Sequence, residues 1–351
     1  MRTEDSMIAE HSVIAEDSVI AGGRPVRWGF LGAGGIAGKL ALDLAVTPGN
    51  VLAAVAARDL DRAQDFAARF GADRAYGDYR ALVEDPEVDV VYVATTHPMH
   101  REQALLAIGA GKPVLIEKPV CLTAEDAAEV FGTAEAAGVF AMEAMWMRTN
   151  PLIRQAQRLI ADGAIGEVRA VRAEMGLGRP YDPAHRLYDL ANGGGALLDL
   201  GVYPATFGWL FLGEPAAMTV TGALAPTGAD ATAAMQWSYP DGRDAQLWCS
   251  AVIGGPYRGL ILGATGWLET EGRFHRPTGL VLHNADGERR FADPLDPSLP
   301  GYRPQIEEVE RCLRAGRLTS ELVPPAETVA ILRLLDRARA GLGVRYPGET
   351  S

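Results

Sequence analysis

Short apolar runs alternate with amphipathic segments from Val26 to about residue 145. Runs such as "VLAAVA" and "VVYVA" are apolar throughout, which is typical of strands that are buried on both faces. The segments between them, for example "DRAQDFAARFG", carry apolar residues at helical spacing and end in glycine. Because strand and helix alternate, this part of the chain predicts a parallel sheet with helices on both faces, an α/β fold.

The alternation stops after about residue 146, and several β-like runs follow between about residues 167 and 292. Two of the runs are joined by "YPDGRDA", whose Asp-Gly is a hairpin signal. One helix within "NGGGALLDLGVYPATFGWLF" interrupts the runs, and two helices follow them, "YRPQIEEVERCLRAG" and "PAETVAILRLLDRARAG". The pattern predicts an α+β domain with an open-faced, mostly antiparallel sheet. Since an open face of this size should be buried against a second copy, we expect a homodimer or homotetramer through this sheet.

Residues 4–21 repeat one hexad three times, as "EDSMIA", "EHSVIA" and "EDSVIA". Three hexads are too few to stack into a solenoid with its own core, so they predict a flexible or lightly docked arm that ends at Gly22-Gly23. The chain is therefore expected to consist of the hexad-repeat arm (1–24), the α/β domain (25–145) and the α+β domain (146–351).

The composition narrows the classes of partner. The 351 residues are 48% hydrophobic and 22% charged, the balance of a globular protein with two domains, and the net charge of −12 argues against nucleic-acid or anionic-membrane partners. The three cysteines show neither metal-ligand nor disulfide spacing, so we expect no metal and a reduced, cytoplasmic setting. No apolar run has the length of a membrane span, and the first residues lack the pattern of a secretory signal.

A glycine motif lies at the first junction of strand and helix, in "VRWGFLGAGGIAGKLALDLA". It matches G-x-G-x-x-G/A, in which the first glycine permits a tight turn and the second leaves room for a pyrophosphate. The N-terminus of the following helix offers backbone N–H groups to phosphate. A purely structural glycine turn is the alternative, but the strand context favours the dinucleotide site of a Rossmann domain. The predicted contacts are Gly32, Gly34, Gly35, Ile36 and Ala37.

The end of the second strand bears on the choice between NADP and NAD. NAD sites usually place an acid there for the ribose 2′-hydroxyl, whereas this strand runs into Arg58, with Arg62 one helical turn later. Two guanidinium groups four residues apart can grip a 2′-phosphate, so the sequence favours NADP, with NAD possible. Asp59 could support NAD if the strand ends one residue later. Alternatively, the arginines pair with Asp59, Asp61 or Asp65.

Polar residues also follow two later strands, in "DVVYVATTHPMH" and "KPVLIEKPV". Parallel sheets bind ligands at the carboxyl ends of their strands, so charge after a buried run indicates the cofactor site. His97 and His100 could contact the nicotinamide ribose or the substrate, or could be capping histidines. The predicted cofactor contacts at these two strand ends are Thr95, His97, His100, Glu117 and Lys118.

The helix in the second half of the chain carries an acid and a tyrosine on one face. Asp199 and Tyr203 are four residues apart, and three glycines, Gly193 to Gly195, precede them. We expect the glycines to allow close backbone approach to a ligand. A tyrosine on an amphipathic helix is more often a core residue, and the acid one turn earlier changes this interpretation only slightly.

Three motifs, "GFLGAGGIA", "EKPV" after a strand and "GGGALLDLGVYP", together resemble oxidoreductases of the glucose-fructose oxidoreductase/inositol dehydrogenase (Gfo/Idh/MocA) family. The resemblance covers about residues 25–345. Within the family, "ATTHPMH", "EAMW" and "DLGVY" are most similar to the dimeric dihydrodiol dehydrogenases and to NADP-dependent xylose and glucose dehydrogenases. Inositol dehydrogenases typically carry a histidine where this sequence has Tyr203, which disfavours an inositol substrate.

The resemblance implies a Rossmann domain followed by an open-faced sheet, with hydride transfer at the nicotinamide. It also implies that Lys118 is the family lysine, that Tyr203 is the acid/base tyrosine with Asp199 one turn earlier, and that the Lys–Pro bond is cis. Oxidation of a secondary alcohol requires removal of the O–H proton, and a phenol with a pKa near 10 needs a nearby cation for this. We therefore expect a Tyr203–Lys118 pair, with Asp199 orienting it or binding a substrate hydroxyl, although Lys118 alone could exchange the proton.

Trp146 and Arg148 would give a sugar or diol an aromatic wall and a guanidinium, although core packing explains Trp146 almost as well. The predicted substrate contacts are Lys118, Trp146, Arg148, Asp199 and Tyr203. The sequence thus predicts an NAD(P)-dependent oxidoreductase that transfers a hydride between NADP and a sugar, polyol or trans-diol hydroxyl, or the matching carbonyl. The alternatives are a catalytically silent NADP-binding regulatory protein and NAD-assisted glycoside cleavage.

Overall fold

The computed structural model describes residues 23–347, so the predicted hexad arm at residues 4–21 lies outside the described residues. The chain divides into two compact units that interleave along the sequence. Of the described residues, the first unit contains 23–121, Glu125–Trp146 and Asp296–Thr328, and the second contains Leu122–Ala124, Met147–Leu295 and 329–347.

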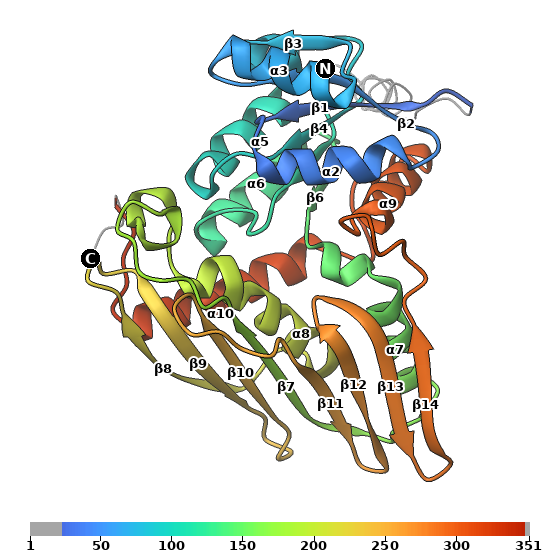
Figure 1. The fold of residues 1–351 in the computed structure, drawn as a ribbon, viewed down its shortest axis with the longest axis vertical. Helices are drawn as coiled ribbons and strands as arrows, with labels where there is room; N and C mark the ends of the chain where they lie inside the picture. The colour runs from blue at the N-terminus through green and yellow to red at the C-terminus, as the bar shows by residue number, and fades with distance from the viewer. Residues whose placement is uncertain (1–22, 348–351) are drawn as a thin grey trace, which may run out of the picture. The chain divides into compact units, whose positions relative to one another are not determined.

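A six-stranded sheet forms the centre of the first unit, in the order β3-β2-β1-β4-β5-β6, and all neighbouring strands are parallel. Its strands are β1 (Val26–Leu31), β2 (Asn50–Ala56), β3 (Arg74–Tyr76), β4 (Val90–Val93), β5 (Val114–Ile116) and β6 (Ala141–Glu143). Its helices are α2 (Gly35–Ala45), α3 (Leu60–Phe70), α4 (Tyr79–Val83), α5 (His100–Gly109), α6 (Ala124–Ala136) and α9 (Arg303–Arg314). The unit has the predicted Rossmann-type α/β fold (Figure 1).

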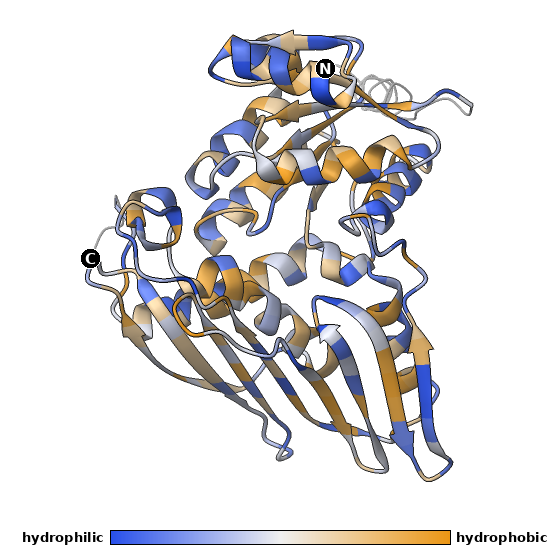
Figure 2. Cartoon of the chain, in the orientation of Figure 1, coloured by the Kyte–Doolittle hydropathy of each residue, from blue (hydrophilic) through white to orange (hydrophobic). Residues whose placement is uncertain are grey.

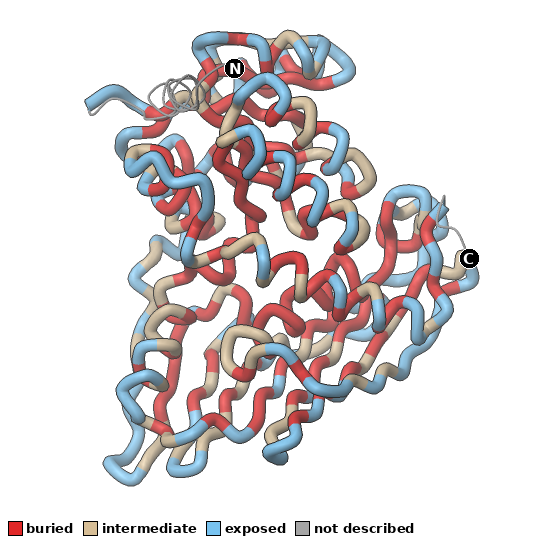
Figure 3. The backbone as a smooth tube through the Cα atoms, turned by 180° about the vertical axis from the view of Figure 1, so that it is seen from behind, coloured by how far each residue is buried: buried red, intermediate tan, exposed pale blue. Residues whose placement is uncertain are grey.

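The strands of this sheet are apolar because they form the core of the unit. Trp28 and Phe30 of β1 and Tyr92 of β4 have no exposed surface, and every residue of β4 and β5 is buried. Figure 3 shows the strands of this core in red. Because β1, β4 and β5 are parallel neighbours, their carboxyl ends lie at one edge of the sheet, where such folds bind ligands.

The segment Asp296–Thr328 belongs to the first unit, although it follows the second sheet in the sequence. The buried carboxylate of Asp43, in α2, accepts the backbone N–H groups of Gly301 and Tyr302, both at 2.9 Å. The predicted second domain, 146–351, therefore differs from the compact units, because buried polar contacts tie a distant segment back to α2.

The second unit is built on an eight-stranded sheet in the order β14-β13-β12-β11-β7-β10-β9-β8. Its strands are β7 (Val168–Gly176), β8 (Ala217–Leu224), β9 (Asp230–Ser238), β10 (Asp244–Ser250), β11 (Gly259–Gly263), β12 (Gly266–Arg273), β13 (Arg276–Asn284) and β14 (Gly287–Ala292). Neighbouring strands are antiparallel except β7 and β10. The β-like run "RGLILGATGWLETEG" contains β11 and β12, and the run "GLVLHNADGERRF" contains parts of β13 and β14. A tight turn joins the two strands of each pair.

Helices cover one face of this sheet. They are α7 (Pro151–Ala161), α8 (Val202–Leu212) and α10 (Pro325–Gly341). α8 packs on β7 and β10, α7 packs on β13, and no described helix covers the other face. Buried and exposed residues alternate along β7 and β9, and Figure 2 shows the matching alternation of hydrophobic and hydrophilic positions across the sheet. The prediction of an open-faced, mostly antiparallel second sheet is confirmed.

The stretch Leu190–Leu212 has the length and apolar composition of a helix that could cross a membrane. However, 83% of its apolar window is buried inside the protein, and α8, which forms its second half, packs on the sheet. We therefore interpret it as a core helix of the second unit.

Candidate active site

The glycine loop between β1 and α2 has the shape of a phosphate-binding turn. Gly32 has a φ of +112°, and a Cβ there would lie 2.7 Å from a backbone oxygen at the end of β4. Gly34 precedes α2 without a side-chain cap, and a Cβ on Gly34 or Gly35 would meet no atom of residues 23–347 within 4 Å. Ile36 and Ala37 form the first turn of α2, and Ala37 is fully buried. The loop therefore fits a pyrophosphate above the free N–H groups of the helix.

Two arginines and a tyrosine gather after β2, and we call Arg58, Arg62 and Tyr79 the arginine cluster. Asp59 caps α3, since its carboxylate accepts the N–H of Asp61 at 3.0 Å. Both arginines are exposed and form no ion pair within residues 23–347, so they do not pair with the neighbouring aspartates. Burial raises the pKa of Tyr79, and the positive charges of Arg58 and Arg62 act against this rise.

Lys118 follows β5 directly, and its backbone is held by buried polar side chains. The Lys118–Pro119 peptide bond is cis, as the resemblance implies. The N–H of Lys118 donates to the Glu117 carboxylate at 3.1 Å. Nδ1 of His100 lies 2.9 Å from the carbonyl oxygen of Pro119, and Nε2 lies 3.3 Å from that of Thr95. A neutral ring carries one N–H, and the shorter contact favours its place on Nδ1. The Lys118 side chain is half-buried at the carboxyl edge of the sheet.

Glu143, the last residue of β6, holds the other side of this turn. Its carboxylate accepts the N–H of Val120 and the hydroxyl of Thr328, both at 3.1 Å, and only 4% of the residue is exposed. Sequence reasoning missed Glu143, although an acid inside the apolar run "AMEAMW" was a usable signal, because buried charges need partners. We refer to Glu117, His100 and Glu143 as the lysine frame.

Two predicted cofactor contacts, Glu117 and His100, are also part of this frame. Glu117 is 5% exposed, its carboxylate also accepts the hydroxyl of Tyr92, and burial raises its pKa to about 7. His100 has no exposed surface, and burial lowers its pKa to about 4, so its ring is neutral. Both side chains are buried and bond the backbone of the lysine turn, and both remain predicted cofactor contacts.

Thr95 and His97, the other predicted contacts after β4, keep some exposed surface. Thr95 is half-buried, and its hydroxyl donates to the side-chain oxygen of Gln103 at 2.6 Å. His97 is 8% exposed, and its ring lies edge-on to that of His100 with centroids 5.7 Å apart. Both remain predicted cofactor contacts.

Trp146 lies in a 3₁₀ turn after β6 and packs against a second aromatic ring. The rings of Trp146 and Tyr302 have centroids 4.7 Å apart at an angle of 42°, and Trp146 is 8% exposed. Tyr302 was missed because it lies in the distant Asp296–Thr328 segment, and no local pattern marks it. Arg148, in the second unit, is 5% exposed. Trp146 and Arg148 remain predicted substrate contacts.

Asp199 and Tyr203 lie on one continuous helix of the second unit. Its first part, Leu197–Gly201, is a π-helical turn, a feature frequent at functional sites, and α8 follows directly. Arg186 donates two hydrogen bonds to the Asp199 carboxylate, at 3.3 and 3.1 Å. The ring of Tyr203 packs against that of His275 with centroids 4.9 Å apart. Sequence reasoning missed Arg186, which begins a short 3₁₀ helix, and His275, which lies in the turn between β12 and β13, because no local motif marks either residue.

Two of the three glycines before this helix lie close to protein atoms, where the sequence suggested close approach of the backbone to a ligand. A Cβ on Gly194 would lie 2.7 Å from the backbone oxygen of Arg186, and one on Gly195 would lie 2.2 Å from the Asp230 carboxylate. Gly193 and Gly195 also have positive φ values, 68° and 133°. These glycines allow the helix to begin in close contact with its neighbours.

Among residues 23–347, no group of three or more His, Cys, Asp or Glu side chains is arranged to hold a metal ion. The three cysteines are free and buried. Burial raises the pKa of Cys121, which follows the lysine turn, so the reactive thiolate form is disfavoured there.

Two family profiles together match most of the chain. The profile of the GFO_IDH_MocA oxidoreductase family, which describes an NAD-binding Rossmann fold, matches residues 26–145. The profile of the GFO/IDH/MocA C-terminal domain matches residues 153–269. These matches fall on the six-stranded and eight-stranded sheets, respectively.

Relatives cover almost the whole chain. Trans-1,2-dihydrobenzene-1,2-diol dehydrogenase of Mus musculus is 36% identical over 337 residues, which are 92% of this chain and 99% of the relative. The 3-ketoreductase KijD10 from Actinomadura kijaniata, solved with NADP and TDP-benzene, has a TM-score of 0.79 at 28% identity, covering 91% of this chain and 98% of that chain. The aldose-aldose oxidoreductase from Caulobacter crescentus shares the fold, with a TM-score of 0.81 at 23% identity and the same coverage of 91% and 98%. The chain therefore belongs to the Gfo/Idh/MocA family of oxidoreductases with an NAD-binding Rossmann fold.

Proposed function

We propose that this chain catalyses NADP-dependent hydride transfer to or from a hydroxyl-bearing carbon of a sugar, polyol or trans-diol. The observation that carries the proposal lies within the first unit. The glycine loop after β1 and the held Lys118 after β5 lie at the same edge of one parallel sheet, separated only by β4. Since ligands bind along this edge in such folds, a dinucleotide held by the loop and a substrate hydroxyl near Lys118 can share it.

The residues of the chain supply proton transfer and orientation, while a bound nicotinamide supplies the hydride acceptor or donor. The ammonium of Lys118 stabilises the phenolate form of Tyr203, which removes the proton of the substrate hydroxyl and becomes the neutral phenol. In the reducing direction Tyr203 returns the proton to the carbonyl oxygen. The two hydrogen bonds from Arg186 orient the Asp199 carboxylate, which accepts a second substrate hydroxyl.

The arginine cluster supports NADP rather than NAD. Arg58 and Arg62 present two exposed, always-charged forks beside Tyr79, which suits a 2′-phosphate. The one acid that could have held the ribose of NAD, Asp59, uses its carboxylate to cap α3. The relative KijD10 was solved with NADP bound.

The substrate class rests on the aromatic pair and on the relatives. Trp146 and Tyr302 provide adjacent flat rings, which suit the face of a sugar or of a cyclic diol. The dihydrodiol dehydrogenases, at 32–36% identity, are named for a cyclic trans-diol, and KijD10 is named as a 3-ketoreductase.

The test is turnover with NADP or NAD and a panel of aldoses, polyols and diols, followed by the absorbance of the reduced nicotinamide. We expect Tyr203→Phe and Lys118→Met each to lower kcat by about 100-fold or more. Loss in Lys118→Met alone would mean that the lysine exchanges the proton by itself. Normal turnover in both variants would refute the assignment, and thermal stabilisation by NADP without turnover would indicate the silent binding protein.

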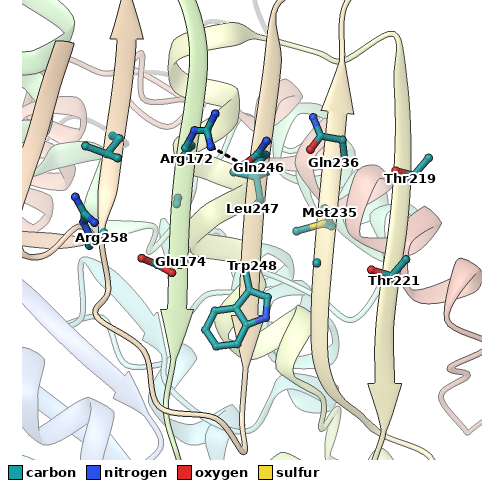
Figure 4. A pocket seen from close by; sticks show the side chains of 13 residues that line it. Arg172, Glu174, Thr219, Thr221, Met235, Gln236, Gln246, Leu247, Trp248 and Arg258 are labelled. Atoms are coloured by element: carbon teal, nitrogen blue, oxygen red, sulfur yellow. Dashed lines mark hydrogen bonds between the residues drawn. The ribbon is translucent and has the colours of Figure 1, made fainter.

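We also propose that the chain is cytoplasmic and forms a homodimer or homotetramer through the open face of the eight-stranded sheet. A hollow of about 470 Å³ on this face is lined by residues of β7 to β11. Figure 4 shows its uncharged polar and aromatic side chains, among them Thr219 and Trp248, and the hydrogen bond of 2.8 Å from Arg172 to Gln246. Aromatic residues and arginine are enriched in interfaces between protein chains.

A further inference from the structure

A buried carboxylate from a distant strand caps the helix that carries Asp199 and Tyr203. Asp230 is the first residue of β9 and has no exposed surface. One of its oxygens accepts the N–H of Leu197 at 2.5 Å, in the first turn of the helix. The N–H of Ala196 also interacts with the carboxylate and acts to lower its pKa. The first turn of the helix is therefore attached to the sheet.

The helix has no cap from its own segment. Ala196 occupies the N-cap position and makes no side-chain hydrogen bond. The first N–H groups of a helix lack partners within it, and a carboxylate satisfies them and interacts favourably with the helix dipole. An ordinary N-cap lies next to its helix, whereas Asp230 is 33 residues from Leu197 in the sequence. This cap thus joins two elements of the second unit instead of closing one loop.

Close packing leaves the carboxylate little freedom relative to the start of the helix. Gly195 has a φ of +133°, and a Cβ there would lie 2.2 Å from the Asp230 oxygen, so a larger residue would displace one of the two. The titratable and charged groups that face Asp230 are Cys249 of β10 and Arg339 of α10. Burial raises the pKa of Asp230 to about 7, because the ionised carboxylate is costly to hold away from water in the folded protein.

We propose that Asp230 is a positioning residue for the reaction, because it sets the rotation and depth at which the helix presents Asp199 and Tyr203. The inference rests on the proposed function of these two residues. Leu197 lies two residues before Asp199 in the same π-helical turn, so a shift of the capped N–H moves the acid directly. A displacement of about 1 Å at a reacting group can cost about 100-fold in rate.

The first test measures kcat in two variants. Asp230→Asn keeps the shape and one acceptor oxygen, and Asp230→Ala removes the cap. We expect kcat to fall about 10-fold in the asparagine variant and about 100-fold in the alanine variant, with the Kd of NADP within about twofold of wild type. Glu308→Gln is the control and should keep kcat, since Glu308 is also a buried carboxylate, 5% exposed, and accepts hydrogen bonds from Arg311 and Ser320 in the first unit.

The second test separates positioning from general stability. In a Tyr203→Phe background, Asp230→Asn should cost less than about twofold, and hydrogen exchange of residues 196–203 should be faster than in Glu308→Gln. Normal turnover by Tyr203→Phe alone would refute only the role of Tyr203, and an Asp199→Asn background then serves for the same comparison. Wild-type kcat in Asp230→Asn, or an equal fold-loss in every background, would overturn the proposal. If Asp230→Ala does not fold, the asparagine variant decides.

Discussion

Lys118 owes its position to buried acids and to a neutral imidazole. Within the lysine frame, burial raises the pKa of Glu117 from 4.5 to about 7. Folding therefore favours the protonated acid, and this contribution to stability is fully present below about pH 4.5 and is lost as the pH rises towards 7. Glu117→Gln should remove this dependence, so its unfolding free energy relative to wild type should rise between pH 4.5 and 7.5, on the order of 3 kcal/mol.

Urea unfolding across this pH range measures the effect. Glu125→Gln, on the exposed part of α6, is a matched control and should show the pH dependence of the wild type. A parallel pair of curves for wild type and Glu117→Gln would contradict the prediction. His100 titrates in the opposite sense, because its lowered pKa makes stability fall as the pH drops below about 6.5, but it is common to all three proteins and cancels.

The arginine cluster gives a second prediction for single residues. Arg58→Ala and Arg62→Ala should each weaken NADP binding by about 10- to 100-fold, as expected for one charge-assisted hydrogen bond, and should leave the affinity for NAD within about twofold. Arg69→Ala is the control, since Arg69 is also exposed and lies on α3 with Arg62, but its guanidinium packs over the ring of Phe70. Fluorescence titration with both cofactors provides the affinities, and equal weakening of NADP and NAD would speak against recognition of a 2′-phosphate.

Periodicity predicts elements well only when they are long enough to show a period. The alternation of apolar and amphipathic segments predicted the parallel sheet and the order of its main elements, but β3 and β6 have three residues each and carry no periodic signal. α7 was missed although Asn150 and Pro151 are good signals for a helix start, and the Asn150 side chain does cap it.

The candidate site divides in the same way. Residues inside local motifs, such as Gly32, Lys118 and Tyr203, could be proposed from the sequence, whereas the residues that support these segments could not. Glu143 and Asp230 each act on a segment that is distant in the sequence, and only the fold brings the partners together. Three glycines before a helix could suggest a ligand, but the sequence does not say that strand β9 would occupy that space.

The start of the helix that carries Asp199 and Tyr203 gives the prediction at this scale. Gly195→Ala should lower the thermal unfolding temperature and kcat, because both its φ of +133° and the Asp230 oxygen 2.2 Å from the new Cβ oppose the change. We expect a loss of more than about 3 kcal/mol in stability, against about 1–2 kcal/mol for Gly163→Ala. Gly163 has a φ of +79° with nothing of the described chain within 4 Å of a Cβ, so it isolates the backbone term. Calorimetry measures the stability of both variants. Comparable losses of stability would mean that the Asp230 carboxylate moves aside without cost, which would contradict the prediction.

Each of the two compact units is built from segments that are separated in the sequence, and no pattern in the sequence predicts this arrangement. The segment Asp296–Thr328 follows the last strand of the second sheet in the sequence, but it belongs to the first unit. Buried contacts such as those of Asp43 hold it there. A domain boundary inferred from a change in periodicity therefore describes only the first crossing between units. Truncation after residue 145 would leave the Rossmann-type unit without α9 and is expected to expose its buried contacts.

The open sheet face gives the prediction for the assembly. Leu260 of β11 lies in register with Arg172 and Glu269 on this face, and a charged side chain there would lose its hydration in any interface formed by the sheet. Leu260→Glu should therefore convert an oligomeric wild type into a monomer, while Leu42→Glu, a 48% exposed position on α2, should not. Light scattering after size exclusion at micromolar concentration distinguishes the states. The unfolding temperature of the wild type should also rise with protein concentration, and that of Leu260→Glu should not, because only association couples stability to concentration. A monomeric wild type, or an oligomer that survives Leu260→Glu, would place the contact elsewhere.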